Sequence, residues 1–390
     1  MISVPSLQQV RRIESEGWFS LNEYQARLSH VRAAMAARGL DGLVVFSPAN
    51  TYYLTGHHSI DSWEFRAVVV THDKPPETLL FHFELGRFLA SSWIDDARYY
   101  GPGDAPISKL SAMIAESGLA AGRLGIETNS PVANEEARKQ LAASLPDAQW
   151  VSASKLIADI RLCKSEQELA AIEHAASLTE LGMQAAVDSA IGNATDNEVA
   201  AAAAHAMLAA GSHNLVMMPT IAVGKRSGLA HSEHVGRRIA EGDSVFLELS
   251  ACWRHYSAPL MKTIFVGDPP RAWENMLQVA ADTANAIIQT AKPGVPAQQV
   301  ARAAHQAMSS IEHEVQYHFN FGYSVGISYP PHWLEDGGFY LTESNPEPIR
   351  AGMVFHLPLT FRVLGACAAG LSHTIAITEN GVRTLTGVGR

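Results

Sequence analysis

Apolar and polar positions along the first 155 residues predict strands separated by helices. Residues 21–39 carry apolar positions at helical spacing and stop at a glycine, which predicts an amphipathic helix with a glycine after its last turn. Residues 40–56 predict a buried strand followed by a turn at Pro48 and Asn50. Further strands are expected in RAVVVTH, ETLLFHF, GRLGIET and AQWVSAS, and helices in SKLSAMIAESGL and NEEARKQLAASL. This alternation indicates an α/β domain, which we place at residues 1–158.

The pattern changes after residue 158, where long helical stretches separate groups of strands. One helical run is expected from residue 155 to residue 190, with Ser165 as an N-cap, and the alanine-rich stretch near residues 200–210 is expected to be a buried helix. Two more helices are expected near residues 272–292 and 295–311. Strands are expected in MMPTIAVG, DSVFLELSA, LMKTIFVG, GMVFHLPLTFRVLG and HTIAITENG. Residues 159–390 are therefore predicted to form an α+β domain with two related halves.

Charge and composition narrow the class of partner. The formal net charge of −10 argues against nucleic acid as the main partner, because a phosphate backbone would repel an acidic protein. The N-terminus lacks the apolar region of a secretory signal, and no uninterrupted apolar run reaches the roughly 18 residues of a membrane span. The three cysteines are widely separated, which favours reduced thiols. We expect a cytoplasmic protein that acts on a small molecule.

Two groups of polar residues stand out from the residue pattern alone. Glu248 lies inside the apolar strand VFLEL, where a carboxylate is costly to bury without a partner, so a role in a site is favoured. His57, His58 and Asp61 could suggest a metal cluster. They lack further ligands at a defined spacing, so they are interpreted as a polar loop.

Six segments, in the right order and spanning essentially the whole chain, resemble the creatinase/aminopeptidase P family. They are YQARLSHVRAAMAARGLDGLVVFSPANTYYLTG, IRLCKSEQELAAIEHAA, PTIAVGKRSGLAHSEHVGRRIAEGDSVFLELSA, GYSVGISYPPHW, AGMVFHL and HTIAITENG. The resemblance implies a creatinase-like α/β N-terminal domain and an α+β catalytic domain of the pita-bread fold. It also implies a homodimer in which the N-terminal domain reaches the partner's active site.

The chain departs from the family's peptidases at the metal ligands. Those enzymes hold two metal ions with Asp, Asp, His, Glu and Glu, and a bridging hydroxide attacks the peptide carbonyl. The corresponding positions here carry Glu248, Pro259, Tyr323, Pro358 and either Ser372 or His373. Proline has no ligating side chain and one carboxylate does not hold two divalent ions, so no metal or other cofactor is predicted. A single-ion site built from Glu248 and nearby histidines remains an alternative.

A finer pattern resembles the ectoine hydrolases within that family. It comprises Glu248-Leu-Ser, the segment RHYSAPL with the following Lys262-Thr263, GYSVG with YPP, and Met-Val-Phe-His356. The loop HHSIDSW does not closely match, and the usual acidic residue near Ser372 is absent. The resemblance implies catalytic roles for His231, Glu248, Tyr323 and His356, and substrate-binding roles for Arg66, Trp63, Phe65, Tyr256, His332 and His373.

Metal-free chemistry is physically reasonable for such a site. A peptide carbonyl needs a Lewis acid or an oxyanion hole, whereas an amidinium or guanidinium carbon already carries positive charge. Histidine can take and return the protons, and Glu248 can orient the substrate or the water. The predicted function is metal-independent hydrolysis of C–N bonds in a small zwitterion of the amidine or guanidine type, such as ectoine or creatine. The alternatives are an Xaa-Pro aminopeptidase or dipeptidase, and a non-catalytic pseudopeptidase that binds a partner.

Overall fold

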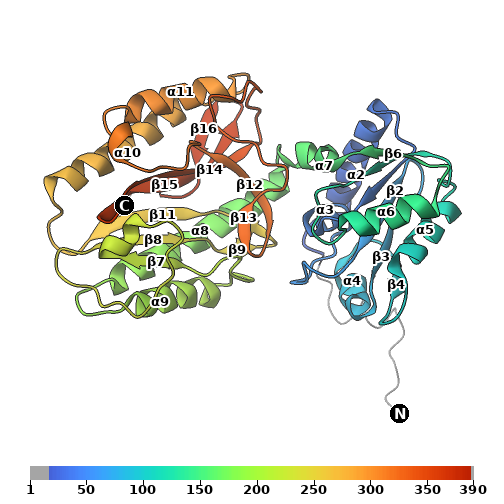
Figure 1. Ribbon diagram of the computed structural model, residues 1–390, viewed down its shortest axis with the longest axis horizontal. Helices are drawn as coiled ribbons and strands as arrows, with labels where there is room; N and C mark the ends of the chain where they lie inside the picture. Colours follow the sequence, from blue (N-terminus) through green and yellow to red (C-terminus); the bar gives the residue numbers. More distant parts are fainter. Residues whose placement is uncertain (1–16, 388–390) are drawn as a thin grey trace, which may run out of the picture. The chain divides into compact units, whose positions relative to one another are not determined.

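The computed structural model describes residues 17–387, and the chain forms two compact units, residues 1–161 and 162–390 (Figure 1). The sequence alone placed this division after residue 158. In the described residues, no helix is long and apolar enough to cross a membrane.

The N-terminal unit is a mixed six-stranded sheet with helices around it, in the strand order β4-β3-β2-β1-β5-β6. β1 runs antiparallel to β2 and parallel to β5. The strands are β1 Gly42–Val45, β2 Ala67–Thr71, β3 Glu77–Phe81, β4 Arg98–Tyr100, β5 Arg123–Ile126 and β6 Gln149–Ser152. The helices are α2 Leu21–Ala37, α3 Pro48–Thr55, α4 Leu85–Ser91, α5 Pro106–Glu116, α6 Glu135–Ser144 and α7 Ser154–Arg161. This arrangement confirms the predicted α/β fold.

The turn expected at Pro48 and Asn50 is wrong, because these residues begin helix α3. The Ser47 side chain accepts a hydrogen bond from the Asn50 N–H as the N-cap, and proline occupies the first turn, where its missing N–H costs nothing. Gly56 ends the helix in the left-handed region at φ 74°. Serine followed by proline begins turns as well as helices, so this local signal does not distinguish the two.

The C-terminal unit is a curled antiparallel sheet of ten strands with four long helices. Its main path runs β7-β8-β11-β15-β14-β12-β10-β9, with β13 paired to β12 and β16 paired to β15. The strands are β7 Thr220–Val223, β8 Ser244–Leu249, β9 Cys252–Trp253, β10 Tyr256–Ser257, β11 Leu260–Phe265, β12 Tyr323–Tyr329, β13 His332–Leu334, β14 Val354–Val363, β15 Cys367–Thr378 and β16 Gly381–Thr384. The helices are α8 Glu166–Ser189, α9 Asp196–Ala209, α10 Arg271–Thr290 and α11 Ala297–Met308. Together these elements confirm the predicted pita-bread fold class.

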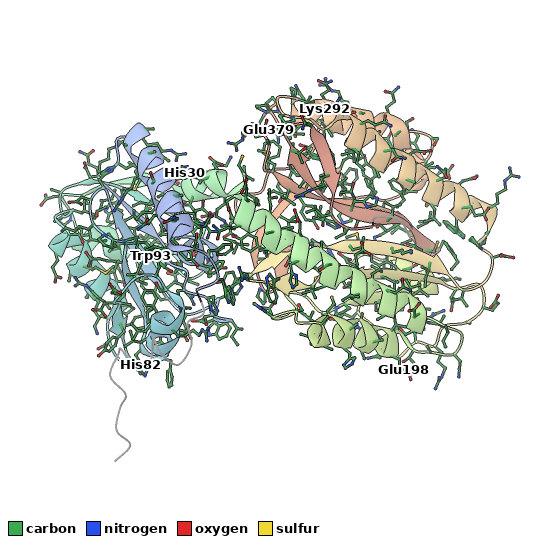
Figure 2. All side chains as sticks on the ribbon, turned by 180° about the vertical axis from the view of Figure 1, so that it is seen from behind. His30, His82, Trp93, Glu198, Lys292 and Glu379 are labelled. Atoms are coloured by element: carbon green, nitrogen blue, oxygen red, sulfur yellow. The ribbon has the colours of Figure 1, made fainter. Side chains whose placement is uncertain are left out.

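The helices cover one face of this sheet, which we call the outer face. Helices α8 and α9 pack against Leu247 and Leu249 of β8, and α10 and α11 pack against Leu357 and Leu359 of β14 (Figures 1 and 2). Successive side chains of a strand point to opposite faces, so the residues between these leucines face the other way. Helix α9 is only half-buried, contrary to the expected buried helix: Ala203 is buried but Ala201 is exposed.

The single helical run expected over residues 155–190 is wrong, because α7 ends at Arg161 and α8 begins at Glu166. Between them, Lys164 forms a buried ion pair with Glu335, with 2.6 Å between Nζ and Oε2. The predicted N-cap Ser165 is confirmed: its side chain accepts from the Glu168 N–H, and the Glu168 carboxylate accepts from the Ser165 N–H.

Replacing Ser165 with alanine is expected to lower the free energy of unfolding by about 1 kcal/mol, because the first turn of α8 loses one partner for its N–H groups. Urea unfolding of the variant checks this value. Ser165→Gly is the matched control, since glycine at an N-cap costs only a few tenths of a kcal/mol. Equal losses in the two variants would contradict a capping role.

Candidate active site on the inner face of the C-terminal sheet

The inner face of the C-terminal sheet, opposite the helices, gathers the polar residues that the sequence singled out. Strand register places Glu248 beside Met261, Tyr323 beside His356, and Pro358 beside Ser372. Residues directly opposite in an antiparallel pair share a face. Their sequence neighbours Leu247 and Leu357 pack on the helices, so these six residues all belong to the inner face.

Glu248 is a buried carboxyl group without a hydrogen-bonding partner among the described residues, although its side chain is not sealed from solvent. The residue is 7% exposed. Burial raises the pKa of Glu248 to about 7, and the positive charge of Arg362 opposes that rise. A carboxyl group that titrates near neutral pH can both take and return a proton. Glu248 therefore has the properties of a general acid/base as well as those of a partner for a cation.

A chain of hydrogen bonds joins Tyr323, His356 and Ser372 across three strands. The Tyr323 hydroxyl lies 2.7 Å from His356 Nδ1, and the Ser372 hydroxyl lies 2.8 Å from Nε2. The Trp333 Nε1–H donates to Tyr323 over 2.9 Å, and the Met261 N–H donates to Ser372 over 2.6 Å. Burial holds the pKa of His356 well below its usual value, so the ring is neutral. A neutral imidazole donates at one nitrogen and accepts at the other, so this chain can pass a proton.

His231 is exposed, in the loop after the short helix Gly224–Gly228, with φ 54°. Its charge is one of the smaller causes that lower the pKa of His318, so the two side chains lie within electrostatic range of each other. Desolvation of the ring is the main cause and the charge of Arg362 contributes, so that the pKa of His318 falls to about 4, although the residue as a whole is exposed. His318 is therefore neutral at pH 7, while His231 is accessible to a ligand.

Sequence reasoning missed Arg362, His318 and Trp333. Arg362 could have been found, because His356, Pro358, Thr360 and Arg362 alternate with the apolar residues of β14 and so share the inner face. His318 lies outside any strand, and no spacing in the sequence connects it to His231.

Three predicted substrate-binding residues of this unit are not brought to the inner face. The Tyr256 hydroxyl donates to Glu168 of α8, over 2.8 Å, and thus faces the helices. His373 pairs with Leu357, faces outward and contacts the Thr386 carbonyl oxygen through Nδ1 over 2.8 Å. His332 is exposed on the short strand β13. Their roles in binding stay predictions that this geometry does not support.

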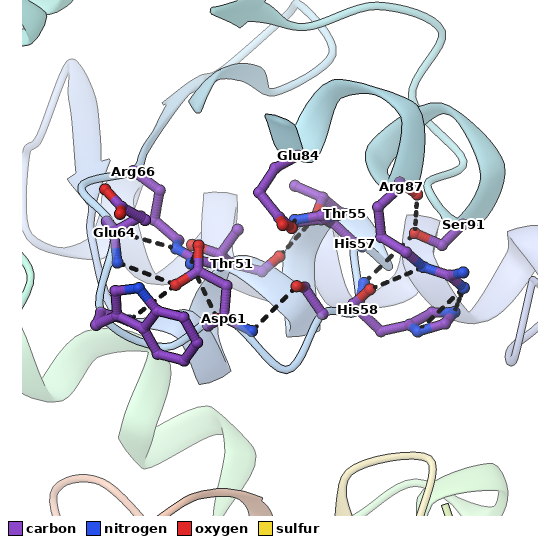
Figure 3. A network of polar contacts seen from close by, with 12 residues as sticks. Thr51, Thr55, His57, His58, Asp61, Glu64, Arg66, Glu84, Arg87 and Ser91 are labelled. Carbon is purple, nitrogen blue, oxygen red and sulfur yellow. Dashed lines mark hydrogen bonds and ion pairs between the residues drawn. The ribbon is translucent and has the colours of Figure 1, made fainter. Parts of the chain in front are cut away.

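Of the three predicted residues of the N-terminal unit, Arg66 lies in a polar network (Figure 3), and the Trp63 N–H donates to Asp61 of the same network. Arg66 is buried and pairs with Asp61, with 2.6 Å between Nη2 and Oδ2, so it is not a solvated charge at a strand end. Trp63 is 67% exposed, and Phe65 packs between Phe46 and Tyr100. Their contact with a substrate in the partner subunit stays a prediction.

The loop at His57, His58 and Asp61 is polar, as expected, but it is buried rather than solvated. His57 Nε2 lies 3.3 Å from a carboxylate oxygen of Glu84, and Arg87 Nη2 lies 3.0 Å from His58 Nε2 (Figure 3). Burial nevertheless lowers the pKa of His57. The network fixes the loop that precedes β2 and therefore holds Arg66 in place.

Comparison with known proteins identifies the class. Residues 170–379 match metallopeptidase family M24, and residues 27–163 match the creatinase/prolidase N-terminal domain. The chain belongs to the M24 family of hydrolases, joined to a creatinase/prolidase N-terminal domain.

Individual relatives are distant but cover nearly the whole chain. An uncharacterized hydrolase/peptidase of Sinorhizobium fredii is 28% identical over 95% of both chains. Ectoine hydrolase of Halomonas elongata is 26% identical over 94% of this chain and 96% of its own. The structure of an Xaa-Pro dipeptidase from Bacillus anthracis superimposes with a TM-score of 0.81 at 16% identity, covering 94% of this chain and 98% of the dipeptidase. The last of these supports the fold and leaves the substrate open.

The family's name implies metal ions, and the inner face does not fit a pair of them. Two divalent ions need several carboxylate and imidazole ligands, and Glu248 is the one carboxylate among the inner-face residues named above. Both ring nitrogens of His356 already make hydrogen bonds. Throughout residues 17–387, no group of three or more His, Cys, Asp or Glu side chains is placed to hold an ion. The reactive groups that this face offers are therefore its carboxyl, imidazole and hydroxyl groups.

Proposed function

We propose that the protein is a metal-independent hydrolase of C–N bonds in a small zwitterion of the amidine or guanidine type, with ectoine as the first candidate. The observation that carries the proposal is Glu248: a buried carboxyl group with a pKa of about 7, on a face whose usual metal-ligand positions hold tyrosine, proline and serine. Such a carboxylate pairs well with an amidinium ion, and the pairing would in turn favour its charged form. The similarity to ectoine hydrolase over 94% of the chain supports the same substrate class.

The reaction needs one water molecule, whose two protons both end on the released nitrogen. The water oxygen forms a bond to the amidinium carbon as one proton passes to a base, and the base returns this proton to the leaving nitrogen. That C–N bond then breaks, the hydroxyl loses its remaining proton to the released amine through the same base, and the products are an amide or urea carbonyl and an ammonium group. We assign the proton transfers to His231, which is accessible, and the orientation of the cation or the water to Glu248. The Tyr323–His356–Ser372 chain supplies neutral hydrogen-bonding groups on the same face as Glu248, which supports this assignment.

A peptidase of the Xaa-Pro type remains the main alternative, because that activity is named for a protein of the same fold. It is disfavoured because a neutral peptide carbonyl needs a Lewis acid or an oxyanion hole, and Pro259 and Pro358 cannot supply metal ligands. A pseudopeptidase that only binds a partner is disfavoured by the retention of His231 and Glu248.

The test is proton NMR of chelator-treated, desalted protein incubated separately with ectoine, creatine and an Xaa-Pro dipeptide. Turnover of ectoine or creatine supports the proposal. Turnover of the dipeptide alone, appearing only after Mn²⁺ or Zn²⁺ is added, would establish the peptidase instead. Failure to turn over any of the three, with or without metal, would reject this function for these substrates and favour a binding role.

His231→Ala is expected to lower kcat on the substrate so identified by at least about a hundredfold while substrate binding persists, because a positioned general acid/base supplies about 10²–10⁴ in rate. Steady-state kinetics and calorimetric binding check both quantities. His234→Ala, in the same loop, is the matched control and should retain turnover. Unchanged kcat in His231→Ala would remove this residue from the mechanism.

A further inference from the structure

We infer that Arg362 is the anchor for the anionic end of the substrate, so that the inner face selects ligands carrying a carboxylate. This inference rests on the proposed function for the identity of the ligand, but not for the position of the arginine. Arg362 belongs to β14, four residues beyond Pro358 and on the same face. It is therefore supplied by the same subunit as Glu248.

The guanidinium of Arg362 is fixed on one side and available on the other. Nη1 donates to the Ser227 carbonyl oxygen over 2.6 Å, and the group stacks over the Phe246 ring with 4.6 Å to the centroid. The residue is 5% exposed. Among the described residues, the guanidinium makes no other hydrogen bond. Its other nitrogens are not fully buried, since none of them is among the atoms there that are both fully buried and without a partner. The free donors are thus preorganised and reachable.

Burying a guanidinium without a contacting anion costs free energy, so its position here favours a role in binding an anionic ligand. Burial lowers the pKa of Arg362, and the negative charge of Glu248 acts in the opposite sense. The two groups therefore sense each other's charge, yet no ion pair within 4.0 Å joins them among the described residues. The Arg362 guanidinium stacks over the ring of Phe246, which lies two residues before Glu248 on β8.

This arrangement presents a carboxylate and a guanidinium on one face, close enough to interact but not in contact. A ligand with a cation at one end and a carboxylate at the other would satisfy both charges. The planar guanidinium is well shaped to bind a carboxylate with two parallel hydrogen bonds. Arg66 is the arginine that the sequence analysis predicted to bind substrate. Its guanidinium already forms an ion pair with the Asp61 carboxylate.

The competing explanation is that Arg362 only secures the loop at Ser227. The two explanations predict different effects of Arg362 substitutions on the affinity for a ligand that lacks the carboxylate. The probes are therefore ectoine and its decarboxylated ring, 2-methyl-1,4,5,6-tetrahydropyrimidine, which keeps the amidine and loses the acid. Binding of both is measured by calorimetry for the wild type, Arg362→Gln and Arg362→Lys. Arg302→Gln, which removes an exposed arginine of α11, is the matched control for loss of charge.

For the wild type, ectoine is expected to bind about 10- to 100-fold more tightly than the decarboxylated ring, since hydrogen bonds to charged groups contribute roughly 1.5–3 kcal/mol. Arg362→Gln should remove that preference by weakening ectoine alone. Arg362→Lys should restore part of it, and Arg302→Gln should keep it. A merely structural arginine would weaken both ligands together, and that result overturns the inference even if Arg362→Gln is partly unfolded.

A second series separates this inference from the proposed function. The thermal midpoint of each protein is measured with creatine, acetate and the decarboxylated ring. If ectoine is not a ligand but creatine or acetate still raises the midpoint of the wild type and not of Arg362→Gln, the anchor stands and the ectoine assignment fails. If ectoine is hydrolysed with equal KM by wild type and Arg362→Gln, the function stands and the anchor fails. Absence of any carboxylate-dependent stabilisation or binding rejects the anchor.

Discussion

Replacing Glu248 with glutamine is expected to lower kcat by about 10²-fold while the protein remains folded, because the group that orients the cation or the water is lost. Glutamine has nearly the same shape but carries no charge to pair with a cation. Because Glu248 has no hydrogen-bonding partner among the described residues, the substitution breaks no contact that holds the sheet together. Steady-state kinetics at pH 7 check the loss, and Glu379→Gln, at an exposed position, serves as the control. Full activity in Glu248→Gln would contradict the proposed site.

The same variant gives a readout of stability that does not depend on the substrate. Burial raises the pKa of Glu248 from 4.5 in the unfolded chain to about 7 in the native state. The native state therefore holds this proton more tightly, so its contribution to stability is complete below pH 4.5 and is lost as the pH rises through 7. At about 1.36 kcal/mol for each pKa unit, the loss is roughly 3 kcal/mol.

Glutamine does not titrate, so Glu248→Gln should gain stability relative to wild type as the pH rises from 5 to 8. The expected gain approaches 3 kcal/mol at the upper end, given the raised pKa of about 7. Urea unfolding at several pH values measures it, and Glu379→Gln should show no such trend. A constant difference between wild type and Glu248→Gln across this range would show that the native carboxyl group titrates normally.

Strand alternation explains which site residues could be predicted from the sequence. Glu248 and His356 were found because each is a polar residue within an apolar strand, and both lie on the inner face. His373 was proposed from an alignment uncertain by one residue. A shift of one residue moves a strand side chain to the opposite face, and the structure gives the inner face to Ser372 instead. The face of the sheet to which a side chain points, and not its nearness in sequence to other site residues, decides whether it belongs to the site.

Long-range pairing explains what the sequence could not supply. The helices and strands were located from local signals such as the Ser165 cap. The contact of Trp333 with Tyr323 depends on β13 folding back on β12, and the contact of Arg362 with Phe246 depends on two strands more than 100 residues apart. No local pattern encodes that order, because strand pairing is selected by the packing of the whole sheet.

The second large effect is expected on stability, from Tyr323→Phe. The change removes the hydroxyl that accepts from Trp333 Nε1–H and contacts His356 Nδ1, and so leaves two buried polar groups without this partner. Each such group costs about 1–3 kcal/mol, so the free energy of unfolding should fall by roughly 2–4 kcal/mol. Urea unfolding measures the loss, with Tyr340→Phe, at an exposed position, as the control.

A double-mutant cycle with Trp333→Phe distinguishes a hydrogen-bond network from simple packing. Once Tyr323 is already phenylalanine, removing the indole N–H also removes one unsatisfied donor, so the double variant should be more stable than the sum of the single losses predicts. The coupling should lie within about 0.5–3 kcal/mol. Additive losses would mean that the two rings contribute only their packing. Coupled losses would mean that the hydrogen bonds themselves contribute to stability and hold Tyr323, His356 and Ser372 in one chain. A fully satisfied buried network of this kind fixes the positions of its hydroxyl and imidazole groups, and this is the preorganisation that hydrolysis without a metal requires.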